Sequence, residues 1–311
     1  MKLLEIKNLS ISFTQYIKGL EQRELKVISD LTMDIHDHEI LAVLGARGSG
    51  KSLLAHAILG ILPENANVSG TIKYKHQELT PTLQEKLRGK NISLIPQSVN
   101  YLNPLMKVKE QAIGYIEDEN QKKLMLEKQR KIFEKYGLSE KVDEMYPFQL
   151  SGGMARKVLI STALLNSPDT IIADEPTPGL DEEAVNETIR DLIELKNNGV
   201  GMLLITHDIL TAIKASDKIA IIYLGYVIEI TKTENILTGK NLLPPYTRAL
   251  YDALPENEFK LTLGHQPSYT EIPKGCPYNE NCPYKTEECI NTPPKLEQVN
   301  DTQVRCYHPL N

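Results

Sequence analysis

The chain has 311 residues, which is long for a single hydrophobic core and short for three, so two units are expected. Hydrophobic residues make up 41% and charged residues 24% of the chain, which is typical of a packed soluble protein and excludes a disordered or collagenous one. The formal net charge of −6 argues against nucleic acid as a partner, because phosphate backbones are bound by clustered lysine and arginine.

No segment has the pattern of a membrane span. The longest mostly apolar stretch, residues 219–230, is far shorter than the roughly 20 residues that a transmembrane helix needs. The N-terminus lacks a basic segment followed by a long apolar one. We therefore expect neither a membrane span nor a secretory signal.

Apolar segments with strand character alternate with helical patterns along most of the chain. This alternation is typical of an α/β protein with a mostly parallel sheet. Each predicted strand is rich in Val, Ile or Leu and is followed by small or polar residues, as buried parallel strands are. The predicted strands cover residues 3–11, 39–44, 170–173 and 201–205.

A glycine-rich loop follows the second predicted strand and precedes a helical run at 53–59. It fits the phosphate-loop pattern of G, four residues, G, K, then S or T. Its residues are Gly45, Ala46, Arg47, Gly48, Ser49, Gly50, Lys51 and Ser52. The glycines allow inward-pointing N–H groups, and the following helix adds partial positive charge, so the loop can cradle phosphate. Lys51 is predicted to reach the β- and γ-phosphates of a nucleoside triphosphate, and Ser52 to bind Mg²⁺.

The stretch at 104–147 has charged helical sequence and little strand character. We interpret it as part of a helical subdomain, at about 104–165, inserted into the sheet domain.

Two adjacent carboxylates, Asp174 and Glu175, end the third predicted strand. Carboxylates at the end of a buried strand are costly unless they are used. Asp174 is predicted to help hold Mg²⁺ and Glu175 to polarise the attacking water. An amphipathic helix is predicted at 182–198. His207 follows the fourth strand, where its imidazole could contact the γ-phosphate.

The segment after Asn235 is rich in proline and weak in periodicity, so a loop-rich C-terminal appendix is predicted. It holds all the cysteines of the chain, which are Cys276, Cys282, Cys289 and Cys306. Disulfides suit secreted chains, structural zinc usually uses closely spaced cysteine pairs, and four thiolates also suit an iron–sulfur cluster. These readings, and unmetallated packing thiols, stay open on the residues alone.

A short motif lies between the phosphate loop and the acidic pair: Leu150, Ser151, Gly152, Gly153 and Met154. It resembles the signature motif of ATP-binding cassette (ABC) ATPases. The resemblance extends to the glutamine loop at Gln97, to residues 178–181 and to the switch histidine at His207. It covers about 3–230 and implies an α/β, P-loop NTPase (RecA-like) parallel-sheet core. It also implies an N-terminal antiparallel β subdomain and the inserted helical subdomain.

The resemblance implies that two cassettes stack head to tail and clamp each ATP between one phosphate loop and the other chain's signature. Ser151, Gly152 and Gly153 would then direct the positive end of a helix towards the γ-phosphate. Gln97 is implied as a catalytic residue and Mg²⁺ ligand that also senses nucleotide state. Phe13, rather than Tyr16, is the candidate to stack on adenine.

Further residues resemble the importer group for oligopeptides, dipeptides and nickel. These are residues 101–104, 146–147 and 245–247 and the final cysteine set. The chain departs from that group at Ala46 and Arg47, where Glu and Ser are usual, and at Ala155, where a polar residue is common. Neither departure removes a group that the chemistry needs.

This resemblance implies a cassette domain at 1–235 and an importer-type extension at 236–311. It implies an ATP-hydrolysing subunit on the cytoplasmic face of the cell membrane. The implied partners are two integral-membrane permease chains, a second and different ABC ATPase and, indirectly, an extracytoplasmic substrate-binding protein. Some members carry a [4Fe–4S] cluster on such cysteines, with zinc as the alternative. The other function considered is a soluble cassette ATPase acting on nucleic acid or ribosomes, which the single cassette and acidic balance disfavour.

Overall fold

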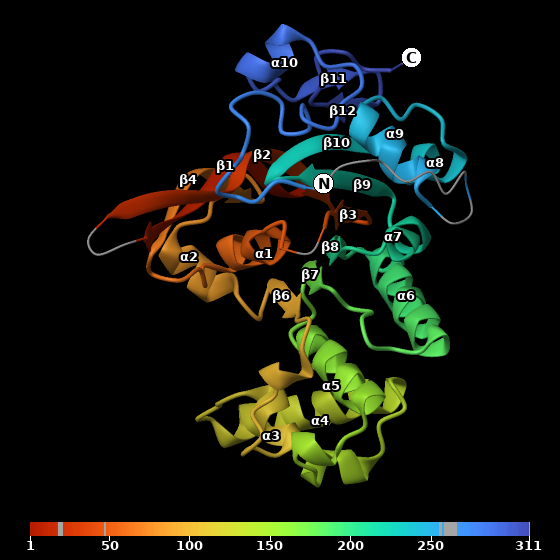
Figure 1. Cartoon of the computed structure of the whole chain (residues 1–311). Helices are drawn as coiled ribbons and strands as arrows, with labels where there is room; N and C mark the ends of the chain where they lie inside the picture. The colour runs from red at the N-terminus through yellow and green to blue at the C-terminus, as the bar shows by residue number, and fades with distance from the viewer. Residues whose placement is uncertain (18–20, 47, 255–256, 258–265, 311) are drawn as a thin grey trace.

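The computed structural model describes residues 1–17, 21–46, 48–254, 257 and 266–310. Figure 1 shows a sheet-containing body, from which a helical subdomain (yellow-green) projects at one end. The C-terminal extension (blue) lies at the opposite end of the body. The α/β arrangement predicted from the sequence is confirmed.

A central sheet positions the candidate site. In the described residues it has eight strands, in the order β11-β12-β10-β9-β3-β8-β7-β6. Its parallel strands are β3 (Ile40–Leu44), β6 (Ile92–Ile95), β7 (Thr170–Asp174), β8 (Gly201–Thr206) and β9 (Lys218–Tyr223). All residues of β3, β7 and β8 are buried, as expected for apolar strands covered on both faces. Three of the four predicted strands are therefore found in this sheet.

Helices cover the two faces of the sheet. Alternate residues of β3 face different cores: Leu41 and Val43 pack with α1 (Lys51–Leu59), and Ala42 packs with α6 (Glu182–Asn197). The remaining helices of the body are α2 (Pro81–Leu87) and α7 (Ile209–Ala215). The helix predicted at 182–198 is confirmed as α6, which the carboxylate of Asp181 caps by accepting from the Ala184 N–H at 2.9 Å.

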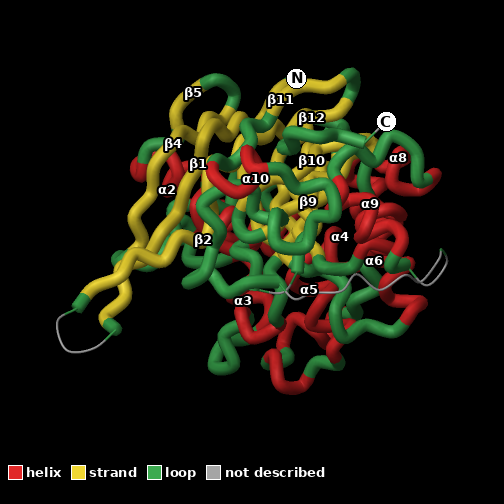
Figure 2. The backbone as a smooth tube through the Cα atoms, turned by 45° about the horizontal axis from the view of Figure 1, so that its top comes forward, coloured by secondary structure: helices red, strands yellow, loops and turns green. Residues whose placement is uncertain are grey.

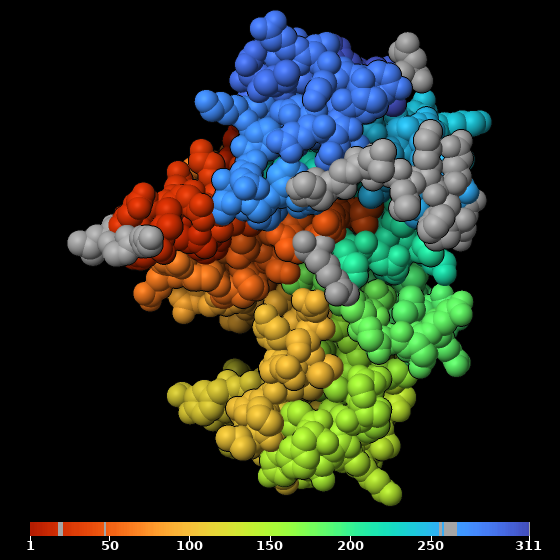
Figure 3. Space-filling model, viewed as in Figure 1, coloured from red at the N-terminus to blue at the C-terminus, as the bar shows by residue number. Residues whose placement is uncertain are grey.

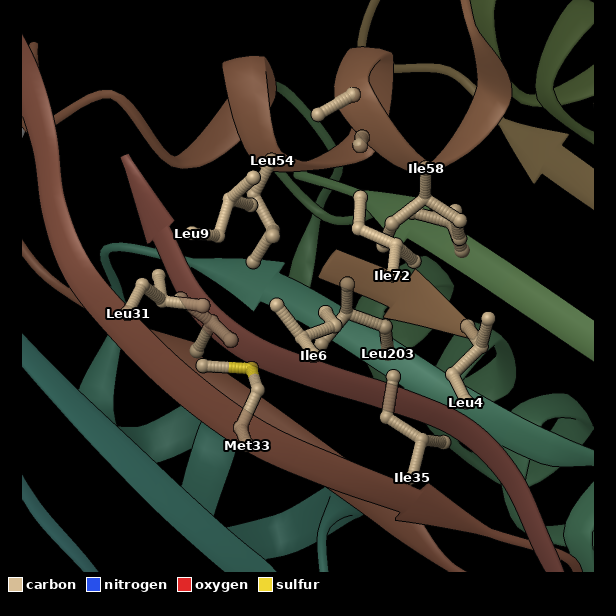
Figure 4. Packing of buried hydrophobic residues seen from close by; sticks show 14 of the residues in the cluster. Leu4, Ile6, Leu9, Leu31, Met33, Ile35, Leu54, Ile58, Ile72 and Leu203 are labelled. Carbon is tan, nitrogen blue, oxygen red and sulfur yellow. The ribbon is translucent and has the colours of Figure 1, made fainter. Parts of the chain in front are cut away.

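The first predicted strand belongs to a separate antiparallel sheet, so its assignment to the parallel strands was wrong. The strands of this sheet are β1 (Lys2–Tyr16), β2 (Gln22–His36), β4 (Ala66–Tyr74) and β5 (Gln77–Glu78). The apolar side chains of β1 are buried outside the parallel sheet. Figure 4 shows Leu4, Ile6 and Leu9 pointing into a core that β1 shares with β2 and α1. The antiparallel subdomain implied by the family resemblance is found.

The helical subdomain contains α3 (Val108–Ile113), α4 (Glu119–Lys135) and α5 (Gly152–Leu164). One short 3₁₀ turn, Val99–Tyr101, precedes α3, and two more, Glu140–Glu144 and Pro147–Gln149, lie between α4 and α5. The subdomain has its own small core, in which Phe133 and Val158 are fully buried. Figure 3 shows this subdomain standing apart from the antiparallel subdomain across a notch in the surface. None of the helices in the described part of the chain is long and apolar enough to cross a bilayer.

The C-terminal extension is more ordered than the predicted appendix. α8 (Thr233–Thr238) spans its predicted start. The extension further contains α9 (Pro245–Asp252), α10 (Glu287–Asn291), β11 (Glu297–Val299) and β12 (Thr302–Val304), connected by loops. Figure 2 shows β11 and β12 beside β10 (Tyr226–Lys232), and β12 pairs with β10 in antiparallel register. The extension therefore continues the central sheet.

Candidate nucleotide-binding site

The phosphate loop joins the end of β3 to the start of α1. Gly50 adopts φ 81° at the N-cap of α1, and a Cβ there would lie 2.7 Å from a methyl carbon of Val27. Glycine is required at this position for both its positive φ and its lack of a side chain. Arg47 lies outside the described residues.

Lys51 points back into its own loop. Its buried ammonium group donates to the carbonyl oxygens of Gly45 at 2.8 Å and Ala46 at 2.9 Å. It also lies 4.0 Å from a carboxylate oxygen of Glu175. Burial lowers the pKa of Lys51, while the nearby Glu175 and Asp174 carboxylates raise it. The ammonium group of Lys51 therefore lies inside the loop, where phosphate oxygens would bind.

Asp174 and Ser52 form a pair suited to a hard cation. Asp174 is buried at the end of β7, and its Oδ1 atom has no hydrogen-bond partner among the described residues. Burial raises the pKa of Asp174, and a hydrogen bond with Ser52 opposes this shift. An unpaired carboxylate oxygen beside a hydroxyl is the kind of oxygen donor set that Mg²⁺ uses. The residues present therefore fit a magnesium ion.

Glu175 lies between Lys51 and His207. Its carboxylate oxygen is 2.6 Å from Nδ1 of His207, and its backbone N–H donates to the Ile205 carbonyl at 2.8 Å. β7 and β8 are parallel neighbours, so their carboxyl ends meet at one edge of the sheet and bring the carboxylate and the imidazole together. Four sequence-predicted residues, Lys51, Asp174, Glu175 and His207, thus converge.

The signature residues lie on the helical subdomain. Ser151 caps α5 by accepting a hydrogen bond from the Met154 N–H at 3.2 Å. Gly152 and Gly153 are exposed, and a Cβ on either would meet nothing within 4 Å. Gln97 is exposed after β6. The open N-terminus of α5 leaves space for another molecule to approach the glycines.

Phe13 lies on β1 and packs, partly buried, against the core shared with α1. Tyr16, farther along the same strand, is 65% exposed. The adenine contact assigned to Phe13 stays a prediction.

The four cysteines line one small cavity of about 20 Å³ between α9 and the loops of the extension. All four are free thiols. Burial raises the pKa of both Cys276 and Cys306 to about 11. Among the described residues, no group of three or more His, Cys, Asp or Glu side chains is gathered closely enough to hold a single metal ion.

Sequence reasoning missed Arg156, a buried residue of α5 whose guanidinium donates to the carbonyls of Pro96 and Glu175. Both partners are backbone atoms in distant segments, so no motif in the sequence signals these contacts.

Known proteins resemble both the sheet-containing body of the chain and its C-terminal extension. A family model described as "ABC transporter" matches residues 28–178, and one described as "Oligopeptide/dipeptide transporter, C-terminal region" matches residues 228–289. The oligopeptide transport ATP-binding protein OppD of Escherichia coli is 31% identical over 99% of this chain and 94% of its own. The chain belongs to the ABC transporter family. The family predicted from its motifs is therefore confirmed.

Other relatives of this ABC cassette have similar coverage. The dipeptide transport ATP-binding protein DppD of Haemophilus influenzae is 30% identical over 100% of this chain and 97% of its own. DppD of Caldanaerobacter subterraneus is 35% identical over 91% of each chain. Among solved structures, the ATP-binding cassette MJ0796, described as a dimeric post-hydrolysis state bound to ADP and Pi, aligns with a TM-score of 0.61. It is 26% identical over 74% of this chain and 99% of its own.

Proposed function

We propose that this chain is the ATP-hydrolysing subunit of an ABC importer for peptides. The observation that carries the proposal is the meeting of Lys51, Asp174, Glu175 and His207 at one edge of the central sheet. The names of the relatives, which are dipeptide and oligopeptide transport ATP-binding proteins, support peptide as the cargo.

In the proposed reaction, the loop N–H groups and Lys51 bind the phosphates of ATP. Ser52 and Asp174, with Gln97, would hold Mg²⁺, which neutralises charge on the phosphates when it is bound. Glu175 accepts a proton from the attacking water. The new oxygen–phosphorus bond forms as the bond to the bridging oxygen breaks, and ADP leaves with that electron pair. His207, held against Glu175, orients the carboxylate and contacts the γ-phosphate.

The second half of each site would come from another cassette. Ser151, Gly152 and Gly153 lie at an exposed helix N-terminus, which can approach a γ-phosphate on a facing chain. The relative MJ0796 is described as dimeric, which supports this arrangement. We propose a related but different ABC ATPase as the facing chain.

Gln97 and the helical subdomain would pass the nucleotide state to two permease chains at the cytoplasmic face of the membrane, with a substrate-binding protein acting indirectly. Tight binding of ATP to the closed pair of cassettes, compared with the open pair, would supply the driving free energy.

Uptake of labelled di- and oligopeptides and of nickel tests this function in source cells whose chromosomal copy carries Glu175→Gln. Peptide uptake should be lost, and nickel uptake should be retained. The matched control is Glu183→Gln, which changes an exposed acid in the first turn of α6 and should leave uptake unchanged. Unchanged peptide uptake in the Glu175→Gln strain would refute the proposal, and loss of nickel uptake alone would reassign the cargo.

We also propose that the four cysteines hold a [4Fe–4S] cluster. Four free thiols line one cavity without gathering around a single centre, as the four sulfurs of a zinc site must do at about 2.3 Å, which favours a group with four separate iron atoms. Such a cluster would tie together the loops of the extension when bound.

Metal analysis of protein purified without oxygen tests the cluster proposal. About four iron atoms per chain are expected, with loss of iron in a Cys289→Ser variant. The exposed Ser268→Ala substitution in the same extension is the control and should retain iron. Zinc in place of iron, or neither metal, would contradict the proposal.

A further inference from the structure

Arg156 links three segments of the site that lie far apart in the sequence. Its side chain is buried, with 5% of the residue exposed. Nη1 donates to the carbonyl oxygen of Pro96 at 2.6 Å, and Nη2 donates to that of Glu175 at 3.3 Å. Pro96 immediately precedes Gln97, and Arg156 lies in the same helix as the signature glycines. One side chain therefore joins the helical subdomain to the glutamine loop and to the acidic end of β7.

The backbone of Glu175 needs support from its surroundings. Its φ of 47° is in the left-handed region, which costs conformational energy for any residue with a Cβ. Three hydrogen bonds hold it, beside the ion pair of its carboxylate with Lys51. The N–H donates to Ile205, the carboxylate contacts His207, and the carbonyl accepts from Arg156. Of these three hydrogen bonds, the one from Arg156 comes from the helical subdomain.

The guanidinium is suited to this bridging role. Burial lowers the pKa of Arg156 to about 10, which leaves it protonated at neutral pH, and the negative charge of Asp174 opposes the lowering. Its planar fork presents two terminal nitrogens to two carbonyl oxygens at once. A lysine ammonium on a flexible stem would hold the same two carbonyls with less geometric constraint.

We propose that Arg156 is a positioning residue for ATP hydrolysis. It fixes the Glu175 backbone so that the carboxylate faces the attacking water. Because it is carried by α5, it also makes the position of Glu175 depend on the position of the helical subdomain. The inference rests on the proposed role of Glu175 as the base that accepts the proton.

The test compares Arg156→Met and Arg156→Lys in the complete transporter complex. The measurements are ATP-binding stoichiometry and affinity, kcat and KM for ATP, and the thermal midpoint. For Arg156→Met, kcat per bound nucleotide should fall by about tenfold or more, because small misplacements of a catalytic group are costly. KM and the binding stoichiometry should change by less than about twofold, because the phosphate loop is not altered. Arg156→Lys should restore part of the lost kcat.

Arg130→Met provides a matched control. Arg130 is also a partly buried arginine that donates to backbone carbonyls, those of Leu138 and Ser139, and it pairs with Asp143 at 2.8 Å. All these partners lie within the helical subdomain. Its substitution should lower the thermal midpoint without changing kcat per bound nucleotide.

An Arg156→Met variant that loses stability but keeps its kcat per bound nucleotide would overturn the positioning role, provided that Glu175→Gln is inactive. If Glu175→Gln hydrolyses ATP at the wild-type rate, the proposed function of Glu175 fails and the role of Arg156 fails with it. If Arg156→Met does not fold, Arg156→Lys, which keeps the buried cation, and Arg156→Gln decide the question together. Wild-type kcat per bound nucleotide in both variants would contradict the role.

Discussion

Glu175 shows how single residues in this chain are held in conformations that serve the site. A left-handed backbone at a non-glycine residue costs about 1–3 kcal/mol, and such strain persists only where the surroundings enforce it. The sequence predicted Lys51, Asp174, Glu175 and His207, because each stands at a fixed place in a motif with a chemical purpose. It could not predict Arg156, since the partners of that residue are carbonyl groups 60 and 19 positions away.

Glu229 on β10 is another residue whose role the sequence did not reveal. It is fully buried, and its Oε1 accepts from the Leu243 N–H at 3.3 Å. Burial raises the pKa of Glu229 to about 7. A buried carboxyl of this kind makes stability depend on pH in the neutral range.

The sign of this dependence follows from the raised pKa. The folded state holds the proton up to about pH 7, whereas the unfolded chain releases it near its ordinary value of 4.5, so stability should fall as pH rises between these values. Relative to Glu229→Gln, the wild type should lose on the order of 3 kcal/mol between pH 5 and pH 8. Urea unfolding of both proteins at each pH measures this difference. A difference that stays constant, or that grows in the opposite direction, would show that Glu229 does not titrate in this range.

At the scale of elements, strands with a continuous apolar sequence could be predicted. Strands that alternate apolar and polar residues, and strands of three residues, could not. β3, β7 and β8 are apolar and wholly buried, so their sequences identify them. β2 alternates buried and partly exposed positions and includes acids such as Asp30 and Asp34, so its sequence did not indicate a strand. β11 and β12 have three residues each, too few for a periodic signal. Their place in the sheet depends on contacts that the extension makes after folding.

Arg305 anchors the extension to the body. Its buried guanidinium donates to the carbonyl oxygens of Val227 on β10, Pro294 in the extension and Asp30 on β2, each at 2.9 Å. It also pairs with the Asp30 carboxylate at 3.0 Å. This one side chain joins both sheets to the last segment of the chain.

Arg305→Met should therefore lower the free energy of unfolding by about 2–4 kcal/mol, because it leaves several buried acceptors unpaired. Urea unfolding measures the loss. Arg248→Met, which alters a partly exposed arginine that stacks over the Tyr251 ring at 5.9 Å, is the control and should cost less than about 1 kcal/mol. An equal loss of unfolding free energy in the two variants would show that the hydrogen bonds of Arg305 do not stabilise the extension on the body.

At the scale of the whole molecule, the residues that we propose as the two halves of a nucleotide site lie in separate parts of the chain. The phosphate loop and acidic pair lie at the edge of the central sheet, and the signature residues lie on the helical subdomain that projects from it (Figure 1). The resemblance to ABC ATPases made this division predictable, because it rests on motifs rather than on periodicity. The continuation of the central sheet into the extension was not predictable, since it depends on strands of three residues.

Phosphate release from ATP by the purified transporter complex, in wild-type and Glu175→Gln forms, tests the central claim most directly. We expect the variant to bind ATP with unchanged affinity and to hydrolyse it at least about a hundredfold more slowly, because it lacks the base that accepts the proton of the attacking water. Lys51→Ala should instead lose ATP binding, which separates the two roles. A Glu175→Gln complex that releases phosphate at the wild-type rate would contradict the account.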